Sequence, residues 1–299
     1  MRNALDISLR LLSLFLYLLS VKKGDVVIVY HSLGYFGVVN LAKKLRGFNL
    51  VLEVEEIYAD VVNASVASKL FERNLISLAD GFIFPTKLLD NVNYNNKRRV
   101  IIHGSYSDKK LSKKSITDAA KEVVDVVYAG TLDARKGVVT FIRSSEHLPS
   151  FYRLHVLGFG SYEEVSAVKD AIGASSNNES KVIYHGLMLG DDYDSFLCSC
   201  DIGVSPQSFT AKFNDTSFPS KILSYISHGL KVVSVRIRSI EESYLKNEIT
   251  FYDGDDPKSL ADAIIEAGSS LGEDGKSIIE ELDEKFESDI GLLISSFHD

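Results

Sequence analysis

Short apolar runs alternate with amphipathic runs along almost the whole chain, and this alternation constrains the fold more than any other feature. The apolar runs of strand length lie at residues 25–30, 50–54, 81–84, 99–102, 123–128, 153–157, 181–184, 202–204, 230–235 and 249–252. Helical patterns fill the gaps, and residues 257–298 form a final pair of helices. Repeated β–α units predict parallel sheets that are covered by helices on both faces.

The length of the chain, 299 residues, suffices for two α/β domains. We therefore predict two Rossmann-like domains, joined through the Lys- and Ser-rich stretch at 104–122. The predicted boundaries are 1–115 for the first domain, 116–275 for the second, and 276–299 for a helix that returns toward the first. Ligands of such domains bind at the carboxyl ends of the strands, so the site is expected there.

Composition excludes some classes of function. The net charge of −8 argues against a general nucleic-acid surface. The only two cysteines, Cys198 and Cys200, are too close to form a bridge and lack a zinc-binding pattern. They are interpreted as reduced thiols, which predicts a cytoplasmic protein.

The run at residues 9–21 is strongly apolar, LRLLSLFLYLLSV, and begins soon after Met1 and Arg2. A membrane-spanning helix needs about 20 apolar residues, so this run is too short to cross a bilayer. No small-residue cleavage pattern follows it, which argues against a signal peptide. Two interpretations stay open: a helix buried in the protein, and peripheral contact with the inner face of a membrane.

Residues 201–234 suggest an anion site. They predict a strand, a polar loop, a helix at 218–228 and a second strand. Ser217 is a fair N-cap, and Pro219 fits the first helical turn, where its missing N–H costs nothing. Free amides at a helix start, together with the lysine at 221, favour a bound anion such as phosphate.

Three strand ends in the second domain add candidate residues. The loop YAGTLDARKG carries Gly130, which lets backbone approach a ligand closely, and Lys136, which can reach a diphosphate. The glycines of LGFGS, Gly158 and Gly160, fit either an ordinary turn or a turn that faces a ligand. At the next strand end, the backbone of His185 could face a nucleobase, although a lone histidine is more often packed.

In order along the chain, these segments resemble the donor domain of GT-B glycosyltransferases of the large retaining family 4. The matching segments are YAGTLDARKG, VLGFGS, VIYHGLM, CDIGVSPQ and FPSKILSYISHGLKVVS, within about residues 123–270. The resemblance implies that Lys136 binds the donor diphosphate and that His185, Gly186 and Leu187 contact the base. The donor-binding set that we expect is Gly130, Thr131, Arg135, Gly158, His185, Gly186, Leu187, Phe218, Pro219, Ser220 and Ser224.

The chain departs from the family pattern at three positions. Thr216 and Ser224 stand where the family usually has two glutamates, one of which holds the donor ribose. Thr131 stands where an arginine is usual, and Arg135 is a candidate to replace it. A neutral serine forms weaker hydrogen bonds than a carboxylate, by about 1 kcal/mol per bond, so donor binding should weaken without being lost.

The first domain resembles the acceptor side of the family less clearly. His31 ends a strand, where it either faces the sugar or is a packed residue. Glu56 and Tyr58 are expected to face the acceptor pocket, with a structural hydrogen-bonding role as the alternative. Compared with the family, the first β–α units of this domain are expected to be missing, which would leave the strand at 25–30 at the edge of the sheet. Because bare edges aggregate, we expect residues 1–21, a second copy or a partner to cover it.

The resemblance implies a hexosyltransferase that moves a sugar from a nucleotide diphosphate to a glycan or lipid-linked acceptor in polysaccharide biosynthesis. The residues expected to take part in the chemistry are His31, Lys136 and Lys221. No metal and no cofactor are expected, and the acids at 191, 192 and 194 are interpreted as residues of a helix start. The alternative is a non-catalytic GT-B remnant or partner subunit that binds nucleotide weakly or not at all.

Overall fold

The computed structural model describes residues 4–55, 57–58, 65–91, 97–104, 123–175, 179–270 and 276–298. The chain forms two compact units. The first comprises Met1–His103, Asp215–Phe218 and Lys285–Asp299, and the second comprises Gly104–Asn214 and Pro219–Glu284. The predicted linker at 104–122 falls, beyond its first residue, outside the described residues, as does the predicted boundary at 115.

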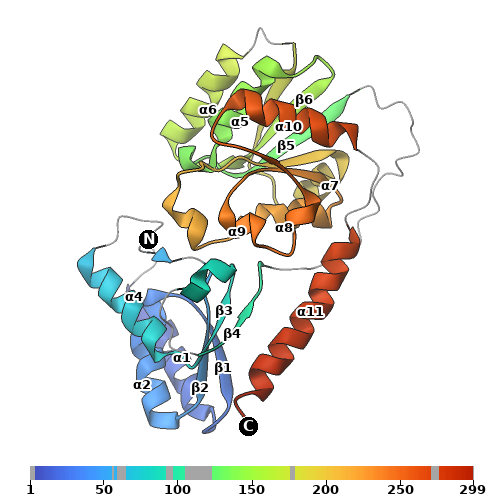
Figure 1. The fold of residues 1–299 in the computed structure, drawn as a ribbon. Helices are drawn as coiled ribbons and strands as arrows, with labels where there is room; N and C mark the ends of the chain where they lie inside the picture. Colours follow the sequence, from blue (N-terminus) through green and yellow to red (C-terminus); the bar gives the residue numbers. More distant parts are fainter. Residues whose placement is uncertain are drawn as a thin grey trace. The chain divides into compact units, whose positions relative to one another are not determined.

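The first unit is built on a parallel sheet with the order β1-β2-β3-β4 (Figure 1). Its strands are β1 (Val26–Tyr30), β2 (Asn49–Glu53), β3 (Gly81–Phe84) and β4 (Arg98–Ile101). On one face the sheet contributes Leu50, Leu52, Phe82 and Phe84 to the core of the unit. The continuous apolar character of β2 and β3 is therefore explained by burial.

Helices α1 (Ala4–Ser20), α2 (Phe36–Arg46) and α4 (Val66–Leu78) belong to the same unit. The helix predicted near residues 86–92 is instead a 3-10 helix, Lys87–Asn91. The second half of α11 (Lys276–Ser295) also belongs to this unit, and beyond that helix Phe297 packs against Gly81 and the Arg98 guanidinium.

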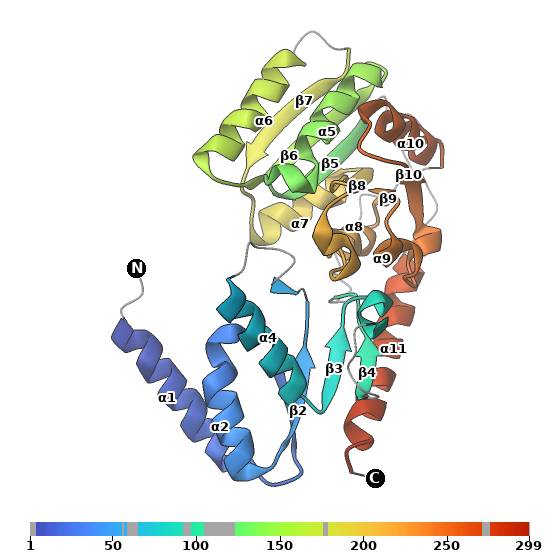
Figure 2. The same cartoon turned by 60° about the vertical axis from the view of Figure 1, so that its left-hand side comes forward.

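Helix α1 corresponds to the apolar run near the N-terminus and packs along α2 (Figure 2). Its inner face reaches the core, where Leu18 is 2% exposed. Its outer face carries Leu9, Leu12 and Leu16, each more than half exposed. No described helix is long and apolar enough to cross a membrane. Contact of this outer face with a membrane surface stays a prediction.

Strand β1 is an edge strand, as predicted, because only β2 pairs with it among the described strands. Ile28 and Tyr30 on this strand are 43% and 44% exposed. Helix α1 packs on α2, and β2 is the one described strand that pairs with β1. Coverage by a second copy or a partner stays a prediction.

The second unit contains a parallel sheet with the order β10-β9-β8-β5-β6-β7. The strands are β5 (Val124–Thr131), β6 (Tyr152–Phe159), β7 (Lys181–Gly186), β8 (Ile202–Ser205), β9 (Lys231–Val235) and β10 (Ile249–Tyr252). The reversal of order between β5 and β8 is the topological switch point of a doubly wound domain, where ligands bind. The predicted two-domain α/β architecture is confirmed.

The helices of the second unit are α5 (Val138–Arg143), α6 (Tyr162–Ala174), α7 (Gly190–Ser199), α8 (Lys221–Ser227), α9 (Arg238–Glu241) and α10 (Pro257–Ser269). Helices α5 and α6 lie side by side, and α10 packs along β9 and β10 (Figure 1). The helix predicted at 240–246 is wrong in extent, because α9 ends at Glu241.

Candidate functional site

The loop after β5 is held in place by its own charged residues. Asp133 caps the 3-10 helix Ala134–Lys136 by accepting a hydrogen bond from the Arg135 amide at 2.9 Å. The Arg135 guanidinium also donates to the Asp133 carboxylate at 2.6 Å, and these hydrogen bonds lower the pKa of Asp133. Arg135 is therefore engaged within the loop, and its predicted role toward the donor stays a prediction.

Lys136, at the end of this loop, lies over an aromatic ring. Its Nζ is 4.0 Å from the centroid of the Phe213 ring, and Phe213 is 3% exposed. A cation over a buried aromatic face is attracted by the ring quadrupole, which orients the lysine. The loop itself is joined to the segment after β8, because the Ser208 amide donates to the Arg135 carbonyl at 2.8 Å.

Lys221 has the most unusual environment of the described lysines. Its Nζ is buried, has no hydrogen-bond partner among the described residues, and lies 4.0 Å from the centroid of the Tyr128 ring. A Cβ atom at Gly130 would lie 3.2 Å from this Nζ, so the glycine keeps the space in front of the ammonium open. Burial, reinforced by repulsion from Lys136, lowers the pKa of Lys221 to about 7. Two nearby cations, one of them buried without a partner, form an electrostatic site for an anion.

Helix α8 begins later than predicted, at Lys221 rather than at residue 218. Pro219 lies before the helix, where its carbonyl accepts from the Ile222 amide at 3.0 Å, and Ser220 occupies the N-cap without a side-chain bond. Phe218 is buried, with its ring stacked on His103 at 4.6 Å. The fixed φ of a proline suits a tight turn as well as a first helical turn, which is why the sequence misplaced the start. Among residues 218–220, only Ser220, at the N-cap, therefore offers an amide of the helix start.

The glycines at the end of β6 are explained by packing. A Cβ at Gly158 would lie 1.8 Å from the Gly130 carbonyl oxygen. A Cβ at Gly160 would lie 2.6 Å from a carboxylate oxygen of Glu164, which closes the capping box of α6. Close approach of backbone at Gly158 and of a side chain at Gly160 accounts for both residues without a ligand, although Gly158 still lies at the predicted strand end.

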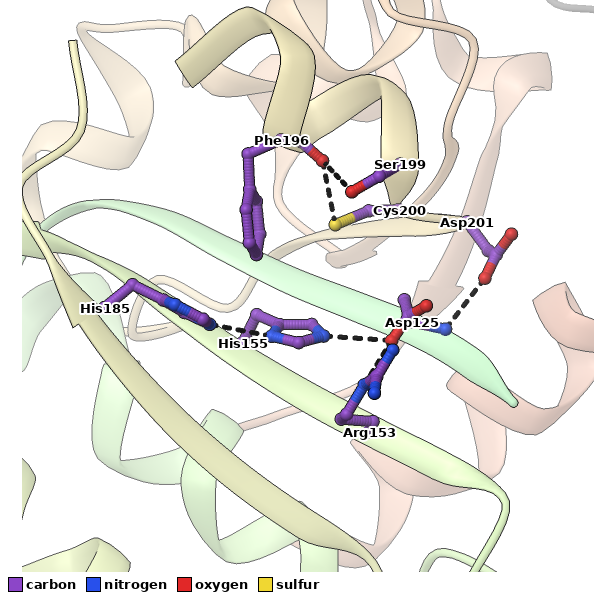
Figure 3. A network of polar contacts seen from close by, with 8 residues as sticks. All are labelled: Asp125, Arg153, His155, His185, Phe196, Ser199, Cys200 and Asp201. Carbon is purple, nitrogen blue, oxygen red and sulfur yellow. Dashed lines mark hydrogen bonds and ion pairs between the residues drawn. The ribbon is translucent and has the colours of Figure 1, made fainter. Parts of the chain in front are cut away.

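The end of β7 is more open. Gly186 has a φ of +74°, Leu187 is 54% exposed, and His185 is half-buried. On one side the His185 ring packs against Phe196 of α7, at a centroid distance of 4.8 Å (Figure 3). A contact of these residues with a nucleobase stays a prediction.

The two positions that lack the family glutamates are occupied by hydroxyls. The Oγ of Ser224 lies 3.4 Å from the Tyr193 hydroxyl, and the buried Oγ1 of Thr216 has no described hydrogen-bond partner. Nearby, Asp194 is buried and pairs with His228 at 3.2 Å, so it is a partner within the fold rather than a residue of the helix start. No described cluster of three or more His, Cys, Asp or Glu could hold a metal ion. That the chemistry needs no metal or cofactor stays a prediction.

In the first unit, His31 lies in a buried cluster and is 1% exposed. The Tyr58 hydroxyl donates to the His31 carbonyl at 2.9 Å, and the Tyr58 amide donates to Glu72 at 2.7 Å. His31 Nε2 lies 3.6 Å from the same Glu72 carboxylate oxygen. Glu56 is outside the described residues. The cluster provides the structural interaction that was the alternative for Tyr58, and the roles of His31, Glu56 and Tyr58 toward sugar or acceptor stay predictions.

Comparisons with known proteins indicate which class of protein has a similar sequence and fold. Residues 123–269 match the model of the family described as "Glycosyl transferases group 1", so this part of the second unit is similar to domains of that family. A comparison with curated protein sequences finds no match. The fold of the chain is that of GT-B glycosyltransferases, as the similarity to several solved structures shows.

One similar structure is Anabaena Alr3699/HepE in complex with UDP and glucose, with a TM-score of 0.67, 13% identity, and coverage of 94% of this chain and 80% of that one. Another is a glycosyltransferase from Rickettsia africae ESF-5, with a TM-score of 0.67, 15% identity, and coverage of 99% and 80%. A third is the lipopolysaccharide outer core galactosyltransferase WaaB in its apo form, with a TM-score of 0.62, 14% identity, and coverage of 98% and 80%.

Sequence reasoning missed the aromatic supports of the two lysines, Phe213 and Tyr128, because contact across the fold leaves no local pattern. It also missed Asp125 and His155, which lie inside buried strands. A signal for these two was present, since a charged residue and a histidine within otherwise apolar strands must find partners if they are buried.

Proposed function

We propose that this protein is a glycosyltransferase that takes a sugar from a nucleotide-diphosphate donor and transfers it to a glycan or lipid-linked acceptor in polysaccharide biosynthesis. The observation that carries the proposal is the buried ammonium of Lys221. It has no hydrogen-bond partner in the part of the chain that the structure describes, and it lies within the residues matched by the glycosyltransferase family. A buried cation is costly unless an anion compensates it, and a donor diphosphate would do so.

In the proposed reaction, the bond between the anomeric carbon of the sugar and a diphosphate oxygen breaks. An acceptor hydroxyl oxygen forms the new bond to that carbon and loses its proton. Negative charge develops on the leaving diphosphate, where Lys221 and Lys136 would stabilise it, and preorganised charge of this kind is usually the largest catalytic contribution. Retention of configuration, a hexosyl group, a role of His31 toward the sugar and a cytoplasmic location belong to the proposal through the family resemblance.

A second candidate function is weak nucleotide binding without catalysis. Its support is the pair Ser224 and Tyr193, which offers neutral hydroxyls where a carboxylate would hold a ribose more tightly. Incubating the purified chain with UDP-sugars and GDP-sugars separates the two candidates. Release of UDP or GDP, by transfer or by hydrolysis, supports the enzyme, whereas nucleotide binding without release supports the alternative.

Replacement of Lys136 by alanine is expected to weaken UDP binding by about 100-fold, because it removes a charged contact to the diphosphate worth roughly 1.5–3 kcal/mol. UDP is the first nucleotide to test because Alr3699/HepE was solved with it. Isothermal titration calorimetry of the wild type and the variant measures the change.

The matched control is Lys169→Ala, on the exposed surface of α6, which removes the same charge away from the loop. It should bind UDP like the wild type. Equal affinity of Lys136→Ala and wild type would remove Lys136 from the site.

A further inference from the structure

A chain of hydrogen bonds crosses three strands of the second unit, from Asp125 on β5 through His155 on β6 to His185 on β7 (Figure 3). His155 Nε2 lies 2.9 Å from the Asp125 carboxylate, and His155 Nδ1 lies 2.9 Å from His185 Nε2. The Arg153 Nε donates to the same Asp125 oxygen at 2.6 Å. Asp125 and His155 are each 6% exposed, so the inner part of this chain is shielded from water.

His185, at the outer end, is placed by a β-bulge. Val156 pairs with Tyr184 and Leu157 pairs with Gly186, so His185 is the extra residue on β7. Bulges re-aim side chains, and this one lies at the carboxyl end of a parallel strand, where open α/β domains bind ligands. The Phe196 ring packs on both imidazoles, with centroid distances of 5.2 Å to His155 and 4.8 Å to His185.

The positions of the protons follow from the donors and acceptors available. An ionised carboxylate only accepts hydrogen bonds, so His155 must carry a proton on Nε2. In a neutral His155 the other nitrogen, Nδ1, is then an acceptor, and His185 must donate to it from Nε2. That leaves Nδ1 of His185 unprotonated, as a hydrogen-bond acceptor.

Two observations favour an arrangement in which His155 and His185 are both neutral. The Arg153 guanidinium already compensates the Asp125 carboxylate, and the carboxylate of Asp201 is engaged by the Asp125 amide at 2.7 Å. Burial, together with the proximity of the Arg153 cation, lowers the pKa of His185, which keeps its ring neutral. His185 forms its hydrogen bond to His155 through Nε2, and no described residue forms a hydrogen bond with its Nδ1.

We propose that Asp125 and His155 are positioning residues that hold His185 with an unprotonated Nδ1, which accepts a hydrogen bond from a ring N–H of a bound nucleobase. Uracil and guanine carry such a ring N–H, whereas the rings of cytosine and adenine in nucleotides do not. The nucleobase part of this inference rests on the proposed function, and the arrangement of protons does not.

The arrangement of protons is tested by NMR on ligand-free protein with ¹⁵N-labelled histidine, using long-range correlations that report which ring nitrogen is protonated. We expect His185 to have a protonated Nε2 and an unprotonated Nδ1. The near-isosteric variant Asp125→Leu removes the oxygen that both Arg153 and His155 contact. Nothing then fixes the His155 proton on Nε2, so His185 should lose its single tautomer and show a mixture of the two.

The matched control is Asp170→Leu on the exposed surface of α6, which should leave the tautomer unchanged. A wild-type His185 protonated on Nδ1, or the same single tautomer in wild type and Asp125→Leu, overturns the positioning role. If Asp125→Leu does not fold, His155→Phe tests the same link, because it removes the acceptor of the His185 proton and should leave a mixture of tautomers. A single unchanged tautomer in His155→Phe would also overturn the role.

The nucleobase part is tested by titrating the same proteins with UDP and CDP. Because sites built to pair a donor discriminate strongly, we expect the preference of the wild type for UDP over CDP to fall in Asp125→Leu and to persist in Asp170→Leu. An unchanged preference together with a mixture of tautomers overturns recognition of the base by His185. If the wild type binds neither UDP nor GDP, the nucleobase assignment fails with the proposed function, while the NMR result still decides the positioning role.

Discussion

Replacing Lys221 by methionine is expected to weaken UDP binding by about 100-fold and, at the same time, to stabilise the ligand-free protein. The affinity falls because a buried charge-assisted contact to the diphosphate is lost, worth roughly 1.5–3 kcal/mol. The stability rises because the wild type keeps the Lys221 ammonium buried, with no described hydrogen-bond partner for its Nζ. Methionine fills a similar volume with a flexible apolar side chain.

The sign and the pH window of the stability gain follow from the pKa. In the folded protein the pKa of Lys221 is lowered from 10.5 to about 7, so between these values the unfolded chain binds more protons. The free energy of unfolding of the wild type therefore rises with pH across this window. At pH 7 the full shift corresponds to an upper bound of roughly 4 kcal/mol, and at pH 9 to about half of that. Methionine should remove this cost.

Urea unfolding of the two proteins without ligand, at pH 7 and pH 9, measures the effect on stability. The gain from Lys221→Met should be larger at pH 7 than at pH 9. The control Lys169→Met changes an exposed lysine and should alter neither stability nor affinity. A variant less stable than the wild type at pH 7 would show that the lysine is satisfied in the free protein.

The lowered pKa of Lys221 should also affect UDP binding, by making it depend on the uptake of a proton. Since a diphosphate favours the ammonium form of Lys221, the wild type should take up close to one proton per UDP at pH 8. Calorimetry in two buffers with different ionisation enthalpies measures this uptake. Lys221→Met should show no uptake from this group, and equal uptake by the two proteins would exclude Lys221 as its source.

The sheets were predictable from the sequence because burial on both faces makes the strands short, continuous apolar runs. The runs at 50–54 and 81–84 appear as β2 and β3, whose inward residues Leu52 and Phe82 are fully buried. The lysines of the site were also predictable as residues, since both follow recognisable strand and turn patterns.

The sequence could not predict which polar groups, far apart in the chain, form hydrogen bonds with one another and which are left without a partner. The start of α8 was misplaced because Ser217 and Pro219 suit a turn as well as a helix start. The isolation of the Lys221 ammonium depends on the Tyr128 ring and on Gly130, some 90 residues earlier in the chain. The link between His155 and His185 depends on a β-bulge, which no pattern in β7 announces.

Replacing Gly137 by alanine is expected to destabilise the protein by roughly 3 kcal/mol or more, which is the second large effect. Gly137 has a φ of +76°, and a Cβ there would lie 1.6 Å from the Pro206 carbonyl oxygen. The left-handed conformation alone costs an alanine about 1–2 kcal/mol. Because the obstacle is backbone, the loop that carries Lys136 must also move, so UDP binding by the folded variant should weaken.

Gly254→Ala is the control that separates these two costs. Gly254 has nearly the same φ, +74°, but nothing lies within 4 Å of its would-be Cβ. It should lose only the conformational part, about 1–2 kcal/mol, and should bind UDP like the wild type. Urea unfolding of both variants at one pH gives the comparison. Equal losses in the two would mean that the Pro206 carbonyl moves aside freely, and the loop after β5 would then not be the rigid support of Lys136 that its packing against Pro206 indicates.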